Sequence, residues 1–133
     1  MQNPSIISHV SVGVSDLARA AAFYDAVLAS LGGRRLLDEG EHGIAYGRQF
    51  PEFWVGRPHD GATPTVGNGT HVAFGAGSRA EVDAFHAAAM AAGGIDDGPP
   101  GPRPHYGAEY YGAFVRDPDG NKVEAMIWEG PLA

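Results

Sequence analysis

The chain contains an internal repeat that spans a whole supersecondary unit. The segment SHVSVGVSDLARAAAFYDAVLASLGG (residues 8–33) returns as THVAFGAGSRAEVDAFHAAAMAAGG (residues 70–94). Both copies show, in the same order, a hydroxyl residue, a histidine, an alternating segment, a serine, an alanine-rich segment and a double glycine. The offset between the copies is 62 at the histidines and 61 at the glycine pairs. Repetition over this length predicts two copies of one structural module.

Each copy begins with a pattern that predicts a β-strand. In the first copy Val10, Val12 and Val14 alternate with His9 and Ser11. Because successive side chains of a strand point to opposite faces, one face is apolar and the other carries the imidazole. The histidine therefore points away from the predicted core.

The alanine-rich segments predict helices that cover the apolar faces of the strands. Ser15 and Ser78 are the expected N-caps, because a serine hydroxyl accepts from the free amides of the first turn, and Ser78 with Glu81 forms a capping box. The double glycines supply left-handed residues that end each helix. The apolar stripes consist of Leu17, Ala20, Ala21, Tyr24, Val27 and Leu28, and of Val82, Phe85, Ala89 and Ala92. The histidine faces are left uncovered.

Short β segments follow each predicted helix. The first copy continues with RRLLDEG, HGIAYG and EFWVG, and the second continues with AEYYGAFVR and NKVEAMIW after a Pro/Gly-rich connection at residues 98–107. The predicted order is β-α-β-β-β, twice. We expect one α+β domain over residues 1–133, with module one at residues 5–58 and module two at residues 68–129.

The last hairpin, FVRDPDGNKVEAMIW, places a carboxylate in an apolar strand. Its DPDG segment fits a type I turn with Gly120 in a left-handed position, and this turn pairs Phe114 with Glu124. Val123 and Ala125 then face the helix, and Glu124 lies on the opposite face. The predicted face of Glu124 is thus the uncovered one, as for the two histidines.

Three side chains with metal-ligand chemistry, His9, His71 and Glu124, share these uncovered faces. Two neutral imidazoles and one carboxylate suit Zn²⁺, Ni²⁺, Mn²⁺ or Fe²⁺, and three ligands leave coordination positions for water or substrate. Each residue alone also has a structural interpretation, since strand histidines are often satisfied within the fold and Glu124 has Lys122 and Arg116 nearby in sequence. The three together favour a divalent metal site, with Glu124 as the candidate catalytic group.

The composition disfavours several other classes of protein. The chain has no cysteine, which excludes a disulfide framework, a thiolate nucleophile and a cysteine-based zinc site. Nine basic against sixteen acidic residues give a net charge of −7, which disfavours nucleic acid as a partner. No apolar run reaches membrane-spanning length, and the start MQNPSIISHV lacks signal-peptide features. We therefore expect a cytoplasmic protein with no membrane partner.

The repeat and the FVRDPDGNKVEAM segment together resemble the vicinal oxygen chelate superfamily. That superfamily includes glyoxalase I, fosfomycin-resistance thiol transferases, bleomycin-resistance proteins, methylmalonyl-CoA epimerases and extradiol dioxygenases. The resemblance covers residues 9–128. It implies two tandem βαβββ modules that form a cupped half-barrel, the glyoxalase-like fold, and usually a homodimer. By position, it implies metal ligands at His9, His71 and Glu124.

The resemblance implies a metal-dependent enzyme that chelates adjacent oxygens of a small-molecule substrate. Lyase or isomerase chemistry of the glyoxalase type ranks first, thiol transfer second and dioxygenation third. The fourth ligand usual in glyoxalase I falls on Trp54, although Glu52 has the same strand parity. Phe114 stands where extradiol enzymes typically have a tyrosine, which weakens ring cleavage. Two alternatives remain: a metal-free, bleomycin-resistance-like binding protein, which is not an enzyme, and an Fe(II) extradiol-type dioxygenase, which is.

The remaining candidates are substrate contacts around the predicted site. They are Trp54, His105, Tyr106, Tyr110, Phe114 and Met126. Tyr110 is expected to face the cup, whereas aromatic and methionine residues of strands also commonly pack in cores. Arg103 and His105 in the Pro-rich connection are candidates to orient an anionic or carbonyl-bearing substrate, with a solvated loop as the alternative.

Overall fold

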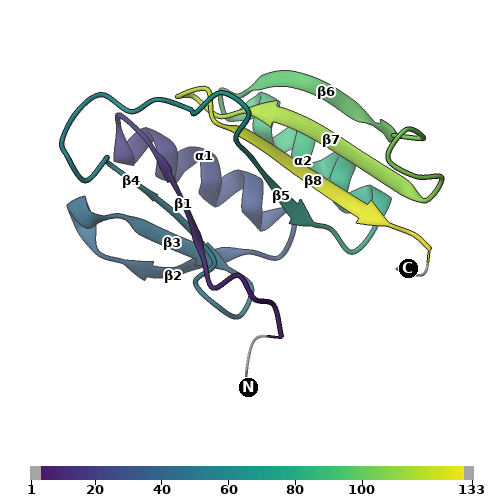
Figure 1. Ribbon diagram of the computed structural model, residues 1–133, viewed down its shortest axis with the longest axis horizontal. Helices are drawn as coiled ribbons and strands as arrows, with labels where there is room; N and C mark the ends of the chain where they lie inside the picture. The colour runs from purple at the N-terminus through teal and green to yellow at the C-terminus, as the bar shows by residue number, and fades with distance from the viewer. Residues whose placement is uncertain (1–3, 131–133) are drawn as a thin grey trace.

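Residues 4–130, which the computed structural model describes, form the two predicted βαβββ modules (Figure 1). Module one contains β1 (Val10–Gly13), α1 (Leu17–Ala29), β2 (Arg34–Asp38), the short 3₁₀ helix η1 (Gly40–His42), β3 (Ile44–Gly47) and β4 (Phe53–Gly56). Module two contains β5 (His71–Gly75), α2 (Arg79–Ala91), β6 (Ile95–Pro102), β7 (Tyr110–Arg116) and β8 (Lys122–Trp128). The predicted α+β architecture is confirmed, and residues 1–3 and 131–133 of the predicted domain lie outside the described part.

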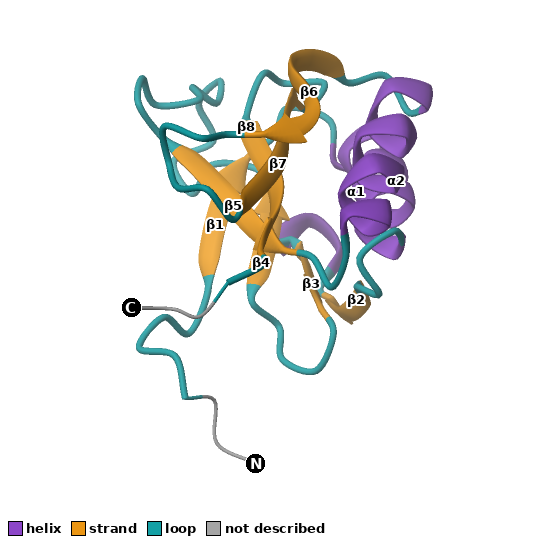
Figure 2. Cartoon of the chain, turned by 90° about the vertical axis from the view of Figure 1, so that its right-hand side faces the viewer, coloured by secondary structure: helices purple, strands orange, loops and turns teal. Residues whose placement is uncertain are grey.

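The two modules have the same sheet topology. The strand orders are β1-β4-β3-β2 and β5-β8-β7-β6. In each sheet the first and last strands of the module run parallel, and the other neighbours run antiparallel. Both helices lie on one side of the strands, so each sheet keeps one face without a helix (Figure 2). We call these faces the open faces of the first and second sheets.

The side-chain alternation predicted from the sequence is confirmed in β5 and β8, the strands that carry His71 and Glu124. In β5, Val72 and Phe74 pack against the core, whereas His71 and Ala73 are exposed. In β8, Val123 and Ala125 belong to the core cluster under α2. The turn pairs Phe114 with Glu124 as predicted. His71 and Glu124 therefore lie on the open face of the second sheet.

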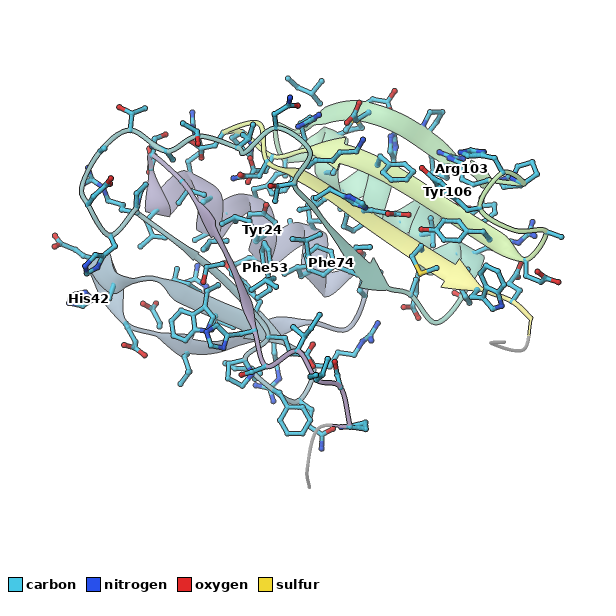
Figure 3. The ribbon with its side chains drawn as sticks, in the orientation of Figure 1. Tyr24, His42, Phe53, Phe74, Arg103 and Tyr106 are labelled. Carbon is cyan, nitrogen blue, oxygen red and sulfur yellow. The ribbon has the colours of Figure 1, made fainter. Side chains whose placement is uncertain are left out.

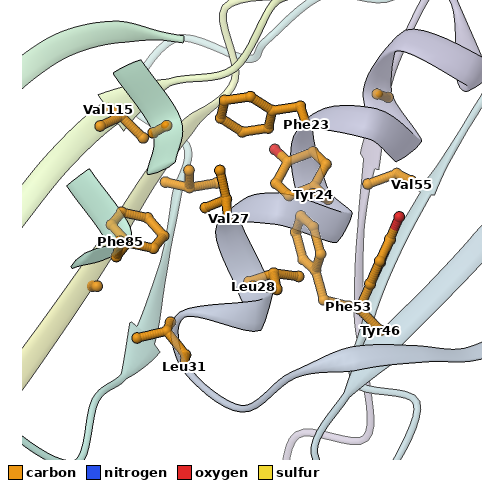
Figure 4. Close-up of a cluster of buried hydrophobic side chains, with 14 of the residues drawn as sticks. Phe23, Tyr24, Val27, Leu28, Leu31, Tyr46, Phe53, Val55, Phe85 and Val115 are labelled. Carbon is orange, nitrogen blue, oxygen red and sulfur yellow. The ribbon is translucent and has the colours of Figure 1, made fainter. Parts of the chain in front are cut away.

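The core joins the two modules through their helices. From α1, Phe23, Tyr24, Val27 and Leu28 meet Phe53, Phe85 and Val115 of other elements (Figure 4). The rings of Phe53 and Phe74 cross the module boundary edge to face, with centroids 5.0 Å apart. Phe23 was missing from the predicted stripe of α1, and Leu17 within that stripe is only half-buried. Over residues 4–130, neither helix is long and apolar enough to cross a bilayer.

The start of α1 differs from the prediction. Its N-cap is Asp16, whose carboxylate accepts from the Arg19 amide at 3.1 Å, and the predicted cap Ser15 is wrong. Ser15 instead donates from its backbone and hydroxyl to Asp119 Oδ1 at 3.0 and 2.6 Å. Ser15 thus serves the contact between modules. At α2 the prediction is confirmed, because the Ser78 hydroxyl accepts from the Glu81 amide at 3.2 Å.

The Pro/Gly-rich connection is half strand rather than loop. β6 continues to Pro102, although the three residues between Gly98 and Pro102 are all proline or glycine. Such residues are tolerated because β6 is the outer strand of its sheet and is bulged, with register shifts on both sides of Gly98. The first half of the connection is therefore the outer edge of the second sheet.

A buried polar network attaches the DPDG turn to the first module. Asp117 is 1% exposed, and its Oδ2 accepts from the Tyr24 hydroxyl at 2.7 Å and from Asn121 Nδ2 at 2.9 Å. Asn121 Nδ2 also donates to the Gly13 carbonyl at 2.9 Å. Burial raises the pKa of the Tyr24 phenol well above its ordinary value, and Asp117 adds to the shift. The phenol therefore stays a donor at neutral pH and holds the end of β1 beside the start of β8.

The Tyr24–Asp117 bond yields a stability prediction. Tyr24→Phe should lower the free energy of unfolding by about 1–3 kcal/mol, because it removes a buried hydrogen bond to a charged group. Urea unfolding measures the effect. The matched control is Tyr111→Phe, which removes a bond of the same length, 2.7 Å, to the exposed Asp83. The control should cost about 0.5 kcal/mol or less, and equal losses in the two variants would contradict the account.

Candidate functional site

A buried carboxylate and a histidine meet at the centre of the second sheet. Glu124 is 1% exposed, and its Oε1 lies 3.2 Å from Nε2 of His71 on the neighbouring strand β5. The parallel register of β5 and β8 pairs Ala73 with Glu124, so the small alanine leaves the imidazole room beside the carboxylate. The His71 side chain keeps 44% of its surface exposed. The pair is thus buried at the carboxylate and open at the imidazole.

The second oxygen of Glu124 is held by Tyr110 from β7. The Tyr110 hydroxyl donates a short hydrogen bond to Glu124 Oε2. Burial raises the pKa of the Tyr110 phenol, and the hydrogen bond to Glu124 raises it further. The phenol therefore remains a donor at neutral pH. This fixes the orientation of the carboxylate and leaves Oε1 on the side of His71.

A glycine makes the Tyr110–Glu124 contact possible. Gly112 lies between Tyr110 and Phe114 on the open face of β7, where a Cβ atom would stand 3.1 Å from Glu124 Oε2 and 3.2 Å from Tyr110 Cε1. Any larger residue would push the phenol and the carboxylate apart. Gly112 is not among the predicted site residues, and the signal for it in the sequence is a glycine inside an aromatic-rich strand, YYGAF.

Phe114 forms one wall of the site. It is 8% exposed, pairs with Glu124 across the hairpin, and its ring centroid lies 6.3 Å from that of His71. The guanidinium carbon of Arg103 lies 5.5 Å from the centre of the Phe114 ring, and Lys122 Nζ lies 5.1 Å from it. Two cations therefore stand at this wall.

Aromatic side chains line the other edge of the site. Ring contacts run from His105 to Tyr106 at 4.2 Å, from Tyr106 to Tyr110 at 5.0 Å, and from Tyr110 to Trp128 at 6.3 Å. Arg103 and Tyr106 project from the connection between β6 and β7 toward the same face (Figure 3). Met126 is half-buried in β8 and is paired with Gly112. Five of the six predicted substrate contacts thus belong to the second module and surround the Glu124 pair.

His9 lies in a different place. It is exposed just before β1, its Nδ1 is 3.0 Å from the Ser8 hydroxyl, and with Trp54 it lines a hollow of about 350 Å³ on the first module. His42, Arg57 and His59 line the same hollow. Glu52 is exposed and lines another hollow, beside Val10 and Val72. Within residues 4–130, no three His, Asp or Glu side chains come close enough together to hold a metal ion.

The docking of the modules explains why His9 stands apart. Asn121, next to the start of β8, bonds to Gly13 at the end of β1, and the start of β8 pairs with His71 at the start of β5. His71 therefore lies toward the end of β1, whereas His9 precedes its beginning. Four residues of extended chain span about 13 Å. A single chain therefore brings together two of the three predicted ligands, His71 and Glu124, and leaves His9 apart from them.

Comparisons with known proteins agree with this architecture. The family model described as the glyoxalase/bleomycin resistance protein/dioxygenase superfamily matches residues 6–125. The chain belongs to this superfamily. A glyoxalase/bleomycin resistance protein from Albidiferax ferrireducens T118 is 40% identical and superposes with a TM-score of 0.85, over 92% of this chain and 99% of that one.

More distant solved structures share the fold. Lactoylglutathione lyase from Agrobacterium tumefaciens is 24% identical, with a TM-score of 0.66 over 96% of this chain and 97% of that one. TioX from Micromonospora sp. ML1 is 22% identical, with a TM-score of 0.61 over 94% and 96%. No curated protein matches the chain significantly. The family and fold are therefore shown.

The space around Gly112 gives a test of the Tyr110–Glu124 contact. Gly112→Ala should lower the free energy of unfolding by about 1–3 kcal/mol, because the added methyl group overpacks the site and displaces the phenol. Chemical denaturation of parent and variant measures the difference. Gly75→Ala is the matched control, since Gly75 is exposed in the same sheet and its added Cβ would meet nothing within 4 Å. Equal free energies of unfolding for the two variants would contradict the close Tyr110–Glu124 contact.

Proposed function

We propose that this protein is a metal-dependent enzyme of the glyoxalase type that acts on a small molecule with adjacent oxygen atoms. The observation that carries the proposal is the pairing of His71 with the buried Glu124 on an open sheet face. One nitrogen and one carboxylate oxygen that face each other are donors suited to Zn²⁺, Ni²⁺, Mn²⁺ or Fe²⁺.

The surroundings of Glu124 fit a cation. A carboxylate buried away from water is costly unless a cation and hydrogen bonds compensate it. Tyr110 supplies a hydrogen bond, and in the described part of the chain His71 is the only basic side chain that pairs with Glu124. His71 is charged only when protonated, whereas a divalent ion between Nε2 and Oε1 would compensate the carboxylate at neutral pH.

A second copy of the chain is the proposed source of the third ligand. His9 is exposed on the first module, and both open faces lie on the same side of the molecule, away from the helices (Figure 2). In a twofold-symmetric dimer, the first sheet of each subunit can lie opposite the second sheet of its partner, which creates two equivalent sites. Such a homodimer would bring His9 of one subunit to His71 and Glu124 of the other.

The chain's own groups have distinct roles in this chemistry. A bound divalent ion would act as a Lewis acid toward charge that develops on the substrate oxygens. With its Oε1 free of the ion, Glu124 would accept a proton from a carbon that bears one of these oxygens and return it to the neighbouring carbon. Tyr110 holds Oε2 and so orients the carboxylate. Phe114 and Met126 limit the access of water.

The proposed donor set and the family favour one reaction class. Lyase or isomerase chemistry ranks first, since it needs an oriented carboxylate and no further cofactor, and lactoylglutathione lyase from Agrobacterium tumefaciens has this fold. An Fe(II) dioxygenase and a metal-free binding protein are the alternatives that metal analysis separates. The absence of cysteine favours a cytoplasmic location.

Metal content tests the proposal directly. Protein prepared without chelators should hold about one divalent ion per subunit, and His71→Ala and Glu124→Ala should each lose it, because removing one ligand of three weakens binding severely. Elemental analysis and calorimetric titration measure this. His86→Ala is the control, since His86 lies on α2 and pairs with Asp96 at 2.8 Å. Parent protein that binds no metal would refute the proposal, and the identity of a bound metal would separate Fe(II) from Zn or Ni chemistry.

Mixing of variants tests whether the site spans two subunits. Neither His9→Ala nor Glu124→Ala alone should bind metal tightly. After co-refolding in equal amounts, about a quarter of the sites should be restored, because each mixed dimer keeps one intact site. A mixture of His71→Ala with Glu124→Ala should restore none, since both residues belong to the same half of the site. Tight binding by the His9→Ala variant alone would exclude His9 as a ligand.

A further inference from the structure

Arg103 is held in one place beside the proposed site. Its Nη1 donates to the carbonyls of Gly101 and Pro102 at 2.9 and 3.2 Å, and its Nη2 donates to that of Pro99 at 2.7 Å. These bonds use three of the five N–H groups of the guanidinium. The group is therefore rigid, positioned against the Phe114 ring, and retains donors for a ligand.

Two glycines of the β6 edge make room for this guanidinium. A Cβ on Gly98 would stand 3.2 Å from Arg103 Nη2 and 3.1 Å from Phe114 Cδ2, and a Cβ on Gly101 would stand 3.4 Å from Arg103 Nη1. Gly98 also has φ +150°, a conformation that other residues rarely adopt. The segment GPPGPRP thus forms a cradle that turns one cation toward the open face.

A second cation reaches the same ring from β8. Lys122 Nζ is 5.1 Å from the Phe114 ring centre and 3.4 Å from Asp97 Oδ2, which Arg116 Nε also contacts at 3.1 Å. Two basic groups therefore share one carboxylate, and Arg103 forms no ion pair among the described residues, although its charge helps to lower the pKa of Asp96 at longer range. Arg103, Lys122 and Arg116 thus outnumber Asp96 and Asp97 at this wall, in a chain whose net charge is −7. A local reversal of charge next to a site attracts anions.

We propose that Arg103 and Lys122 bind a carboxylate of the substrate, so that the substrate is a small organic acid with two adjacent oxygens at a distance from this carboxylate. The inference rests on the proposed function for the role of His71 and Glu124. In the proposed complex, the two adjacent oxygens of the substrate face His71 and Glu124. The carboxylate of the substrate lies beside Phe114, on the same face of the sheet. The planar fork of arginine suits a carboxylate, and lysine adds a second charge.

Two acids of equal length serve as probes. 2-Oxoglutarate and 2-oxopentanoate carry the same adjacent oxygens, and only the first has a carboxylate at the far end. The parent should bind 2-oxoglutarate about tenfold more tightly, since a charge-assisted hydrogen bond contributes roughly that factor. Lys122→Met and Arg103→Met should reduce the preference to about twofold or less. Arg34→Met, at an exposed position of β2, is the control and should keep it.

Calorimetric titration of metal-loaded and of metal-free protein separates this inference from the proposed function. A preference for 2-oxoglutarate that both variants lose supports the inference, even if the protein binds no metal. Equal binding of the two acids by the parent overturns it, as does a preference that persists in both variants, and so does failure of both acids to bind. If Arg103→Met unfolds because the cradle needs its bonds, Lys122→Met decides the outcome alone, because Lys122 makes no bond to the cradle.

Discussion

The Asp117 carboxylate joins the two modules, and the placement of the candidate ligands relative to one another depends on that junction. It accepts from Tyr24 of α1 and from Asn121, which in turn bonds to Gly13 of β1. This network fixes the start of β8 beside the end of β1. As a consequence His71 and Glu124 meet within one chain, whereas His9 is left at the opposite end of β1. The same interaction that stabilises the subunit therefore divides the predicted ligand set and makes a second subunit necessary for the proposed site.

Within the second sheet, a buried carboxylate is held in one orientation by its neighbours. Glu124 occupies a position of β8 where an apolar residue would pack, and it needs the Tyr110 phenol, the His71 imidazole and a glycine at 112 to be accommodated. Buried polar groups of this kind are retained where orientation matters more than packing. Arg103 follows the same pattern, because a cradle of glycines and carbonyls orients a cation that solvent alone would leave mobile.

The sequence was sufficient for features that depend on local chemistry and periodicity. The repeat predicted two βαβββ modules, and the DPDG turn predicted the pairing of Phe114 with Glu124, because turn type fixes register and register fixes the face of each side chain. It was insufficient where a side chain has two possible partners. Ser15 bonds to Asp119 instead of capping α1. The Pro/Gly-rich segment forms an edge strand, and only the assembled sheet shows which strand is outermost. The separation of His9 from His71 depends on module docking, which no local pattern encodes.

The central claim is that His71 and Glu124 of one subunit and His9 of another hold one divalent ion. Anomalous X-ray diffraction from crystals of the metal-loaded protein tests it most directly. The account predicts one strong peak per subunit, about 2.0–2.2 Å from His71 Nε2, from a Glu124 oxygen and from an imidazole nitrogen of the partner subunit's His9. A peak bound by side chains other than Glu124 and His71, or a protein that remains metal-free in the crystal after loading, would contradict it.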